Sequence, residues 1–217
     1  MKIGIVSAIY VTNQRHFELA ERSLQTFTDS KHEIINIGVV NKLNSEYKKL
    51  ESYYHHMMDN DENCLASAWN KGIDLALKLK CDYVIVANLD VELDPNCIDN
   101  FIVGATYTQD AIMWVGRIKN EAYYGDSHPN DFSLFMINLK TINTLGAFDE
   151  RFKPAYFEDQ EMIARIKHKG YHYTRIDGAT YLHHGQQTVK NDSEISDIVG
   201  AMWARNQELY HEIISNY

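Results

Sequence analysis

The chain has 217 residues, 45% of them hydrophobic, and a formal net charge of −9 from 21 basic and 30 acidic residues. This length and composition predict a single domain, 1–217, with one substantial core, and the lack of a basic block argues against nucleic acid as a partner. Three widely spaced cysteines, Cys64, Cys81 and Cys97, match neither a disulfide framework nor closely paired metal ligands. Reduced thiols and a cytoplasmic location fit them best.

The first apolar segment, Ile3–Ile9, is rich in β-branched residues and predicts a central strand. Its apolar run is too short for a signal peptide. Ala20–Phe27 has a helical pattern, and His32–Val40 predicts a second strand. The polar stretch Asn41–Asp61 predicts a surface helix or loop. Cys64–Lys80 carries apolar residues at helical spacing, which predicts an amphipathic helix.

Tyr83–Asn88 is an apolar run typical of a buried parallel strand. Pro95 suits the first turn of a following helix that runs to about Val103. Ala111–Val115 predicts a further strand. The glycine, proline, asparagine and aspartate residues of Lys119–Asp131 predict a loop.

The second half of the chain is less regular. Its predicted elements are a strand at Phe132–Ile137, a short helix at Lys140–Leu145, a helix at Asp159–Lys169 ended by Gly170, strands at Tyr171–Ile176 and Thr180–His184, and a helix at Ile195–Ile214. Strands that alternate with helices in the first half predict an α/β fold with a mostly parallel sheet, and the second half predicts a mixed lobe on that sheet. No run approaches the roughly 20 apolar residues of a membrane span, so no transmembrane segment is expected.

Two acidic clusters indicate chemistry. Asp90 and Glu92 follow the buried strand, and ligands bind beyond the carboxyl ends of such strands. Carboxylates suit a hard divalent cation, which in turn suits a phosphate-bearing ligand, although both acids could simply belong to a turn. Glu158 and Asp159 could supply a base or could only cap a helix. Together the clusters suggest metal-assisted group transfer from a phosphorylated donor.

Two long segments resemble a known family. Residues 63–101, NCLASAWNKGIDLALKLKCDYVIVANLDVELDPNCIDNF, resemble the central segment of glycosyltransferase family 2 and its rhamnosyltransferase-like relatives. Residues 146–185 resemble the acceptor-side segment, and the closing ARNQELYHEI resembles the carboxy-terminal helix. The resemblance implies a GT-A fold with a donor-binding half, 1–105, and an acceptor-side half, 106–217. It also implies a nucleotide-sugar donor, a divalent cation and, commonly, inversion at the sugar carbon.

The resemblance assigns the metal site position by position. Asn88-Leu89-Asp90 occupies the Asp-x-Asp site, with Asp90 as the main carboxylate ligand to Mn²⁺ or Mg²⁺. Glu92 lies two residues further, on the same side of an extended segment, and could assist. His183 matches the histidine that closes the metal site. The choice of His183 over His184 rests on the resemblance alone, since lone histidines are more often structural than ligands.

The resemblance also implies the other site residues. Glu158 and Asp159 match the Glu-Asp pair, with Asp159 as the general base. Asn70 and Gly72 match residues that line the helix of the donor pocket. Relatives often carry an aspartate that reads the nucleotide base where this chain has Asn41, whose amide can still hydrogen-bond a base. The donor is therefore left open as UDP-, GDP- or dTDP-linked.

The aromatic residues allow more than one interpretation. Trp69 and Trp203, at helical spacing among apolar neighbours, predict core positions. Tyr123 and Tyr124, in the irregular loop, could stack on a sugar face or only pack within that loop.

The leading prediction is a metal-dependent glycosyltransferase that moves a hexose or deoxyhexose from a nucleotide-diphosphate sugar to a hydroxyl of a glycan or glycoprotein. The first alternative is a sugar-binding module with an inactive site. The second is a sugar nucleotidyltransferase, which would need a glycine-rich basic loop after the first strand. Residues 8–13, AIYVTN, contain no glycine, so the second alternative ranks low.

Overall fold

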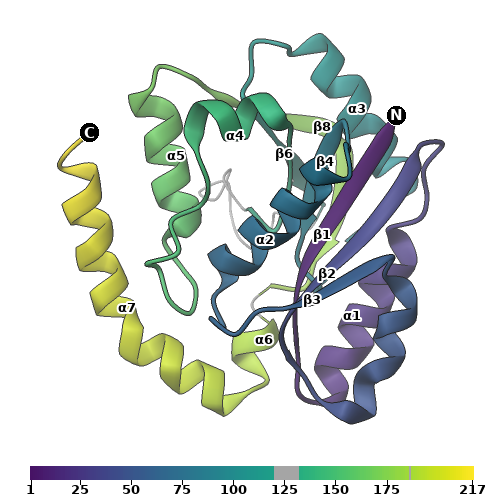
Figure 1. The fold of residues 1–217 in the computed structure, drawn as a ribbon, viewed down its shortest axis with the longest axis vertical. Helices are drawn as coiled ribbons and strands as arrows, with labels where there is room; N and C mark the ends of the chain where they lie inside the picture. The colour runs from purple at the N-terminus through teal and green to yellow at the C-terminus, as the bar shows by residue number, and fades with distance from the viewer. Residues whose placement is uncertain (120–131, 186) are drawn as a thin grey trace.

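The computed structural model describes residues 1–119, 132–185 and 187–217 (Figure 1). Within these residues, one mixed sheet has eight strands in the order β3-β2-β1-β4-β7-β6-β8-β5. The strands are β1 (Lys2–Val11), β2 (Glu33–Leu43), β3 (His56–Asp59), β4 (Tyr83–Ala87), β5 (Val91–Leu93), β6 (Met113–Ile118), β7 (Leu134–Ile137) and β8 (Tyr173–His183). The helices are α1 (Gln14–Thr26), the 3₁₀ helix η1 (Ser45–Tyr53), α2 (Leu65–Lys78), α3 (Cys97–Tyr107), α4 (Leu139–Leu145), α5 (Glu158–His168), α6 (Gln187–Lys190) and α7 (Ser193–Ile214).

Strands β3, β2, β1 and β4 are parallel and form the first half of the sheet. Successive side chains of a strand point to opposite faces, so β1 contributes to two cores. Ile3 and Ile5 pack with α1, η1 and α3 on one face, whereas Val6 packs with α2, α4 and α5 on the other. The sheet is therefore covered on both faces, as an apolar parallel sheet requires.

The second half of the sheet is mixed. Strand β7 lies antiparallel between β4 and β6, while β8 is parallel to β6 and antiparallel to β5. The predicted α/β class, with a mostly parallel sheet and a mixed second half on the same sheet, is confirmed. Helix α7 lies alongside α5 at the edge of the molecule (Figure 1). None of the helices in the described ranges is long and apolar enough to cross a membrane.

Several predicted elements were wrong in detail. Asn41–Asp61 is not simply a surface helix or loop, because it contains the end of β2, η1 and the four-residue edge strand β3. The two strands predicted at Tyr171–Ile176 and Thr180–His184 are one strand, β8, which continues through the residues between them. Pro95 lies before α3 rather than in its first turn, because Asn96 is the N-cap residue. Strand β5 and helix α6 were not predicted.

The loop predicted at Lys119–Asp131, with Tyr123 and Tyr124, lies outside the described residues apart from Lys119. Gly170 follows the C-cap of α5 with φ of +74°, which confirms its predicted C′ position.

Candidate active site

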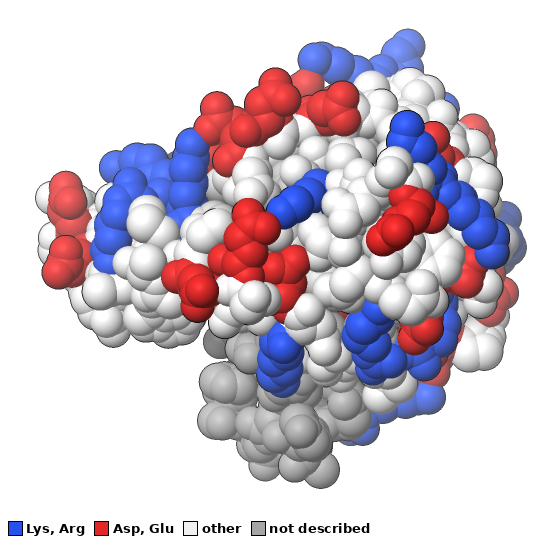
Figure 2. All heavy atoms as spheres, turned by 90° about the horizontal axis from the view of Figure 1, so that it is seen from below, with Lys and Arg blue, Asp and Glu red and all other residues white. Residues whose placement is uncertain are grey.

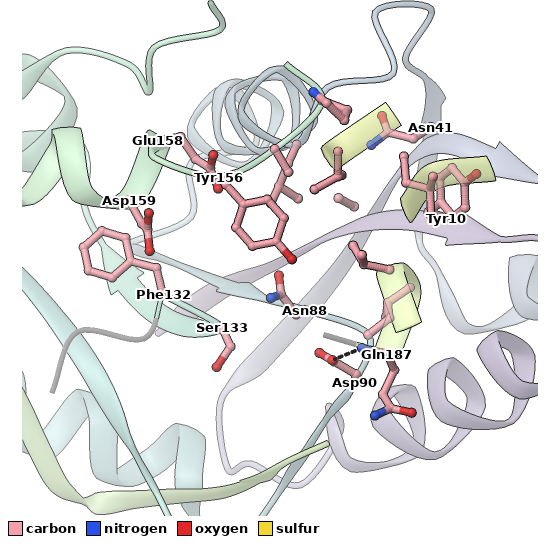
Figure 3. A pocket seen from close by; sticks show the side chains of 18 of the residues that line it. Tyr10, Asn41, Asn88, Asp90, Phe132, Ser133, Tyr156, Glu158, Asp159 and Gln187 are labelled. Carbon is pink, nitrogen blue, oxygen red and sulfur yellow. Dashed lines mark hydrogen bonds between the residues drawn. The ribbon is translucent and has the colours of Figure 1, made fainter. Parts of the chain in front are cut away.

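A pocket of about 720 Å³ lies at the carboxyl ends of the parallel strands. Tyr10 of β1, Asn41 of β2 and Asn88, just after β4, line one side of it (Figure 3). The segment before α5 and the first half of α7 line the other side, through residues that include Tyr156 and Val199. Ligands of open α/β sheets bind in this position, so the topology alone marks the pocket as a candidate site.

The pairing of β5 with β8 brings Asp90 and His183 together. Leu89 and Asp90 form a turn after β4, and β5 then runs antiparallel to β8, with Val91 opposite His183. The His184 amide donates to the Asp90 carbonyl oxygen at 2.9 Å, which continues this ladder by one residue. As a result, Asp90 Oδ1 lies 3.4 Å from His183 Nε2, and both buried side chains line the pocket.

Gln187 is a site residue that the sequence did not reveal. It is the first residue of α6, and its backbone amide donates to Asp90 Oδ2 at 3.4 Å (Figure 3). Its side chain donates to the carbonyl oxygens of His184 and Gly185, at 2.8 and 3.2 Å, and so holds the turn after β8. A single glutamine in a polar stretch carries no pattern that would have identified this role.

Glu92 does not share the pocket with Asp90. Its carboxylate lies 2.7 Å from His184 Nε2 and 3.4 Å from Arg22 of α1, and it is not among the pocket-lining residues. The prediction that Glu92 shares a side with Asp90 assumed an extended segment, in which residues two apart point the same way. Leu89 and Asp90 instead form a turn, so this expectation does not apply. This geometry also separates the two histidines, since His183 lines the pocket and His184 pairs with Glu92.

Asn70 and Gly72, which the resemblance places along the donor pocket, are not among the residues that line this pocket. The Asn70 amide accepts from the Phe148 amide at 2.9 Å and donates to the Phe148 carbonyl oxygen at 2.9 Å. A Cβ on Gly72 would lie 2.2 Å from Val6 Cγ1. Asn70 therefore fixes the loop after α4, and Gly72 allows α2 to approach β1 closely.

Asn41 lies in the pocket with its amide oriented by neighbours. Its Oδ1 accepts from Asn60 Nδ2 at 2.7 Å, and buried Asn60 in turn accepts from the Ser67 hydroxyl at 3.0 Å. The Asn41 oxygen is thus engaged by the protein, and its NH₂ group is the part that can donate to a ligand.

The carboxylates of Glu158 and Asp159 lie on the opposite side of the pocket, in the first turn of α5 (Figure 3). Glu158 is only 4% exposed. Burial, with the charge of Asp159 in addition, raises the pKa of the Glu158 carboxyl from 4.5 to about 8. Glu158 is therefore mostly protonated at neutral pH, whereas Asp159, whose Oδ1 accepts from the Gln160 amide at 2.8 Å, is the better candidate for an ionised base.

Tyr156 projects into the pocket between the two acidic groups (Figure 3). Burial raises the pKa of its phenol, and the charges of Glu158, Asp90 and Asp159 raise it further. The residues predicted as metal ligand and base line the same pocket as Tyr156, and their charges act on its phenol.

Helix α7 fixes the segment that carries Tyr156. Buried Asn206 donates from Nδ2 toward the carbonyl oxygens of Lys153 and Ala155, at 3.1 and 3.0 Å. Trp203, one turn earlier on α7, is not a core residue as predicted. It is 44% exposed and lines the pocket.

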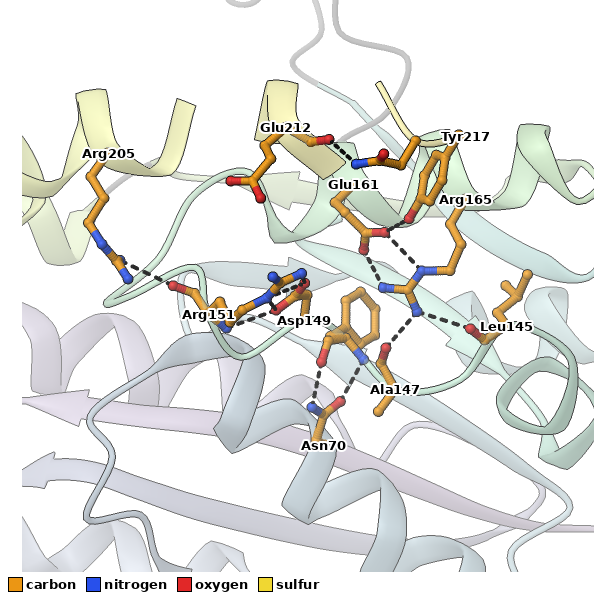
Figure 4. A network of polar contacts seen from close by, with 12 residues as sticks. Asn70, Leu145, Ala147, Asp149, Arg151, Glu161, Arg165, Arg205, Glu212 and Tyr217 are labelled. Atoms are coloured by element: carbon orange, nitrogen blue, oxygen red, sulfur yellow. Dashed lines mark hydrogen bonds and ion pairs between the residues drawn. The ribbon is translucent and has the colours of Figure 1, made fainter. Parts of the chain in front are cut away.

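A network of polar contacts joins α5 to α4, to the loop after α4 and to Tyr217 (Figure 4). Glu161, 1% exposed, binds the Arg165 guanidinium and the Tyr217 hydroxyl. Arg165 also donates to the carbonyl oxygens of Leu145 and Ala147, at 3.0 and 2.7 Å. The helix that carries the candidate base in its first turn is thereby attached to α4 and to the chain after α7.

The residues present fit a cation that is shared with a ligand. No group of three or more His, Cys, Asp or Glu side chains that could hold a metal ion by itself occurs in the described part of the chain. Asp90 and His183 offer one carboxylate and one imidazole. Mg²⁺ usually takes only one or two protein carboxylates together with phosphate oxygens, and imidazole is acceptable to Mn²⁺.

Basic and acidic side chains are interspersed on the face shown in Figure 2. There, Lys and Arg side chains form separate groups among Asp and Glu side chains. This distribution agrees with the overall charge of −9.

Comparison with known protein families and with curated proteins finds no match to this chain. Solved structures do match. One is the mannosyltransferase PcManGT from Pyrobaculum calidifontis in complex with GDP-Man and Mn²⁺, with a TM-score of 0.66 and 10% identity over 87% of this chain and 59% of that one. Another is GalNAc-T7 with UDP, GalNAc and Mn²⁺, with a TM-score of 0.64 and 14% identity over 97% of this chain and 49% of that one. The chain therefore has the α/β fold of GT-A glycosyltransferases, and it spans about half to three fifths of these two proteins.

Proposed function

We propose that this protein is a divalent-cation-dependent glycosyltransferase that moves a hexose or deoxyhexose from a UDP-, GDP- or dTDP-linked sugar to a hydroxyl of a glycan or glycoprotein. The observation that carries the proposal is a single pocket with Asp90 and His183 on one side and Asp159 on the other. Its place at the carboxyl ends of the parallel strands supports a nucleotide ligand. The complexes of PcManGT with GDP-Man and Mn²⁺ and of GalNAc-T7 with UDP, GalNAc and Mn²⁺ support it by analogy of fold.

The donor would bind along the strand ends. Asn41 would donate from its NH₂ group to an acceptor atom of the nucleotide base, and Asn88 would contact the sugar-diphosphate portion. Asp90 and His183 would hold Mn²⁺ or Mg²⁺ together with the diphosphate. A cation bound there would neutralise the charge that develops on the departing diphosphate. Glu92 is not assigned to this group, because it is engaged by Arg22 and His184.

The acceptor would enter from the side of α5 and α7. Asp159 would accept the proton of the acceptor hydroxyl. As the proton leaves, the acceptor oxygen bonds to the anomeric carbon, and the bond from that carbon to the diphosphate oxygen breaks. The products are the glycoside and the nucleoside diphosphate. Attack from the face opposite the diphosphate inverts the anomeric configuration. Glu158, protonated at neutral pH, would donate a hydrogen bond rather than act as the base.

The experiment that tests the proposal is a turnover assay with UDP-, GDP- and dTDP-sugars, each with Mn²⁺ and with EDTA. Release of nucleoside diphosphate that requires acceptor and is lost with EDTA is the expected result. Sugar binding without release of nucleoside diphosphate would favour the inactive sugar-binding module. Release of pyrophosphate from a nucleoside triphosphate and a sugar phosphate would favour a nucleotidyltransferase.

A further inference from the structure

Helix α7 places one partly exposed tryptophan at the pocket. Trp203 is 44% exposed, whereas Trp69 and Trp114 are 2% and 3% exposed. The Trp203 ring centroid lies 5.3 Å from that of Tyr156 and 5.0 Å from that of Phe157. A large aromatic surface left open in a concave site is typical of a ligand-binding surface rather than of a core.

The backbone beneath these rings is unusual. Tyr156 and Phe157 have φ of +75° and +78°, a left-handed conformation that bulky residues rarely adopt. Such conformations persist where the surroundings enforce them, and they cluster at ligand-binding and active sites. Here the enforcing group is Asn206, 1% exposed, whose Nδ2 lies 3.1, 3.0 and 3.4 Å from the carbonyl oxygens of Lys153, Ala155 and Tyr156.

The left-handed backbone at Tyr156 and Phe157 places their two side chains in different surroundings. The Tyr156 ring enters the pocket beside Trp203, and the Phe157 side chain is buried. Glu158 and Asp159 follow at once at the start of α5. The Tyr156 ring therefore lies between the candidate base and Asp90 (Figure 3), and the Trp203 ring packs against it on the side of α7.

We propose that Tyr156 and Trp203 form an acceptor subsite that binds the apolar face of a sugar ring, so that the attacking hydroxyl belongs to a saccharide. This inference rests on the proposed glycosyltransferase function and names its acceptor class. A pyranose ring presents C–H groups on its face and hydroxyls on its edge. The rings of Tyr156 and Trp203 pack against the C–H groups of this face, and Asp159 accepts the proton of one hydroxyl on the edge.

The charge of α7 disfavours a lipid surface as the occupant. Its sequence, SEISDIVGAMWARNQELYHEII, contains four acidic residues, Glu194, Asp197, Glu208 and Glu212, and one basic residue, Arg205. The helix thus carries a net charge of −3 with its histidine neutral. Anionic bilayers attract basic segments and repel this one.

The first test uses tryptophan fluorescence of the protein without donor, so that it does not depend on turnover. The probes are the methyl glycosides of glucose, galactose, mannose, N-acetylglucosamine and rhamnose. We expect saturable protection of the fluorescence from acrylamide by at least one of them, because Trp203 is the exposed tryptophan. Tyr156→Ala is expected to abolish the protection. Tyr107→Ala removes an aromatic ring that is 85% exposed on α3 and is expected to leave the protection unchanged.

The second test separates the subsite from the reaction. In the active enzyme, Trp203→Ala is expected to raise the acceptor KM about tenfold while the donor KM stays within about twofold, and Trp203→Phe is expected to restore most of the loss. Binding of the glycosides to Trp203→Ala, which lacks the reporter, is measured by saturation-transfer NMR and is expected to be lost.

The outcomes distinguish the two proposals. Turnover with an acceptor KM unchanged in Trp203→Ala would overturn the subsite and leave the glycosyltransferase proposal standing. Glycoside binding at Trp203 in a protein that turns over no donor would overturn the glycosyltransferase proposal. Protection of Trp203 by phosphatidylglycerol vesicles but by none of the five glycosides would overturn the saccharide assignment.

Discussion

Asp90 Oδ1 lies 3.4 Å from His183 Nε2, although the two residues come from opposite halves of the chain. The contact depends on three residues, because Val91–Leu93 pair antiparallel with the end of β8. The Gln187 amide then approaches the second oxygen of Asp90 from α6. The candidate metal site is therefore assembled by the edge of the sheet rather than by any continuous motif.

Asp90→Ala is expected to remove the cation-dependent part of donor binding. A donor at about 100 times its Kd stabilises the wild-type protein by about 2.7 kcal/mol through mass action. We expect this stabilisation, measured as a thermal shift with Mn²⁺ against EDTA, to be lost in Asp90→Ala. Glu92→Gln is the matched control, because Glu92 lies outside the pocket, and it should retain the shift. An undiminished EDTA-sensitive shift in Asp90→Ala would refute the metal assignment.

Asp159→Asn is expected to lower kcat by about 10²- to 10⁴-fold, the usual contribution of a general base. Donor affinity should stay near the wild-type value, because Asp159 lies across the pocket from Asp90. Glu158→Gln provides the comparison. Since burial holds Glu158 protonated, an amide of the same shape should preserve most of kcat. The opposite ranking of the two variants in a steady-state assay would assign the base to Glu158.

The stability of the protein should fall as the pH rises through the range in which Glu158 ionises only in the unfolded state. Its pKa is about 8 in the folded protein and 4.5 ordinarily, so between these values the folded state holds a proton that the unfolded state releases. The free energy of unfolding therefore decreases from pH 4.5 to about pH 8 for this group. Urea unfolding at pH 5 and pH 8 should show a larger decrease in the wild type than in Glu158→Gln. Equal decreases would show that Glu158 does not titrate in this way.

The core of the fold was predictable from local patterns, whereas the site depended on pairing between distant segments. Ile3–Ile9 and Tyr83–Asn88 are apolar enough to predict central strands. Val91–Leu93 is too short for any periodicity to be recognised, and its partner in β8 lies far along the chain. Without β5, neither the turn at Asp90 nor the pairing of Glu92 with Arg22 and His184 could be foreseen.

Residue type alone also could not separate packing from ligand binding. Gly72 and Asn70 match residues of a donor pocket by resemblance, yet one accommodates Val6 and the other holds Phe148. Trp203 has the helical spacing of a core residue. It is partly exposed because the face of α7 that carries it lines the pocket. The spacing of apolar residues along one helix does not indicate whether that face packs on a core or lines a pocket.

Glu161→Ala is expected to lower the free energy of unfolding by about 3–5 kcal/mol. The side chains of Glu161 and Arg165 are 1% and 13% exposed, and removing one partner of a buried pair leaves the other charge uncompensated (Figure 4). The matched control is Asp74→Ala, which breaks the i,i+4 pair with Lys78, whose side chains are 63% and 71% exposed. That change should cost less than about 1 kcal/mol. Similar losses for both variants in urea unfolding would contradict the structural role given to Glu161.

Gly72→Ala is expected to destabilise the protein by about 1–3 kcal/mol, because the new Cβ would lie 2.2 Å from Val6 Cγ1 at the contact between α2 and β1. Adding Val6→Ala should recover part of this loss by making room. Gly200→Ala is the control, since a Cβ there meets nothing within 4 Å, and it should stabilise α7 by about 0.5–1 kcal/mol. Donor affinity of the folded Gly72→Ala protein, measured by calorimetry below its melting temperature, should equal that of the wild type. A large loss of affinity without loss of stability would return Gly72 to the donor pocket.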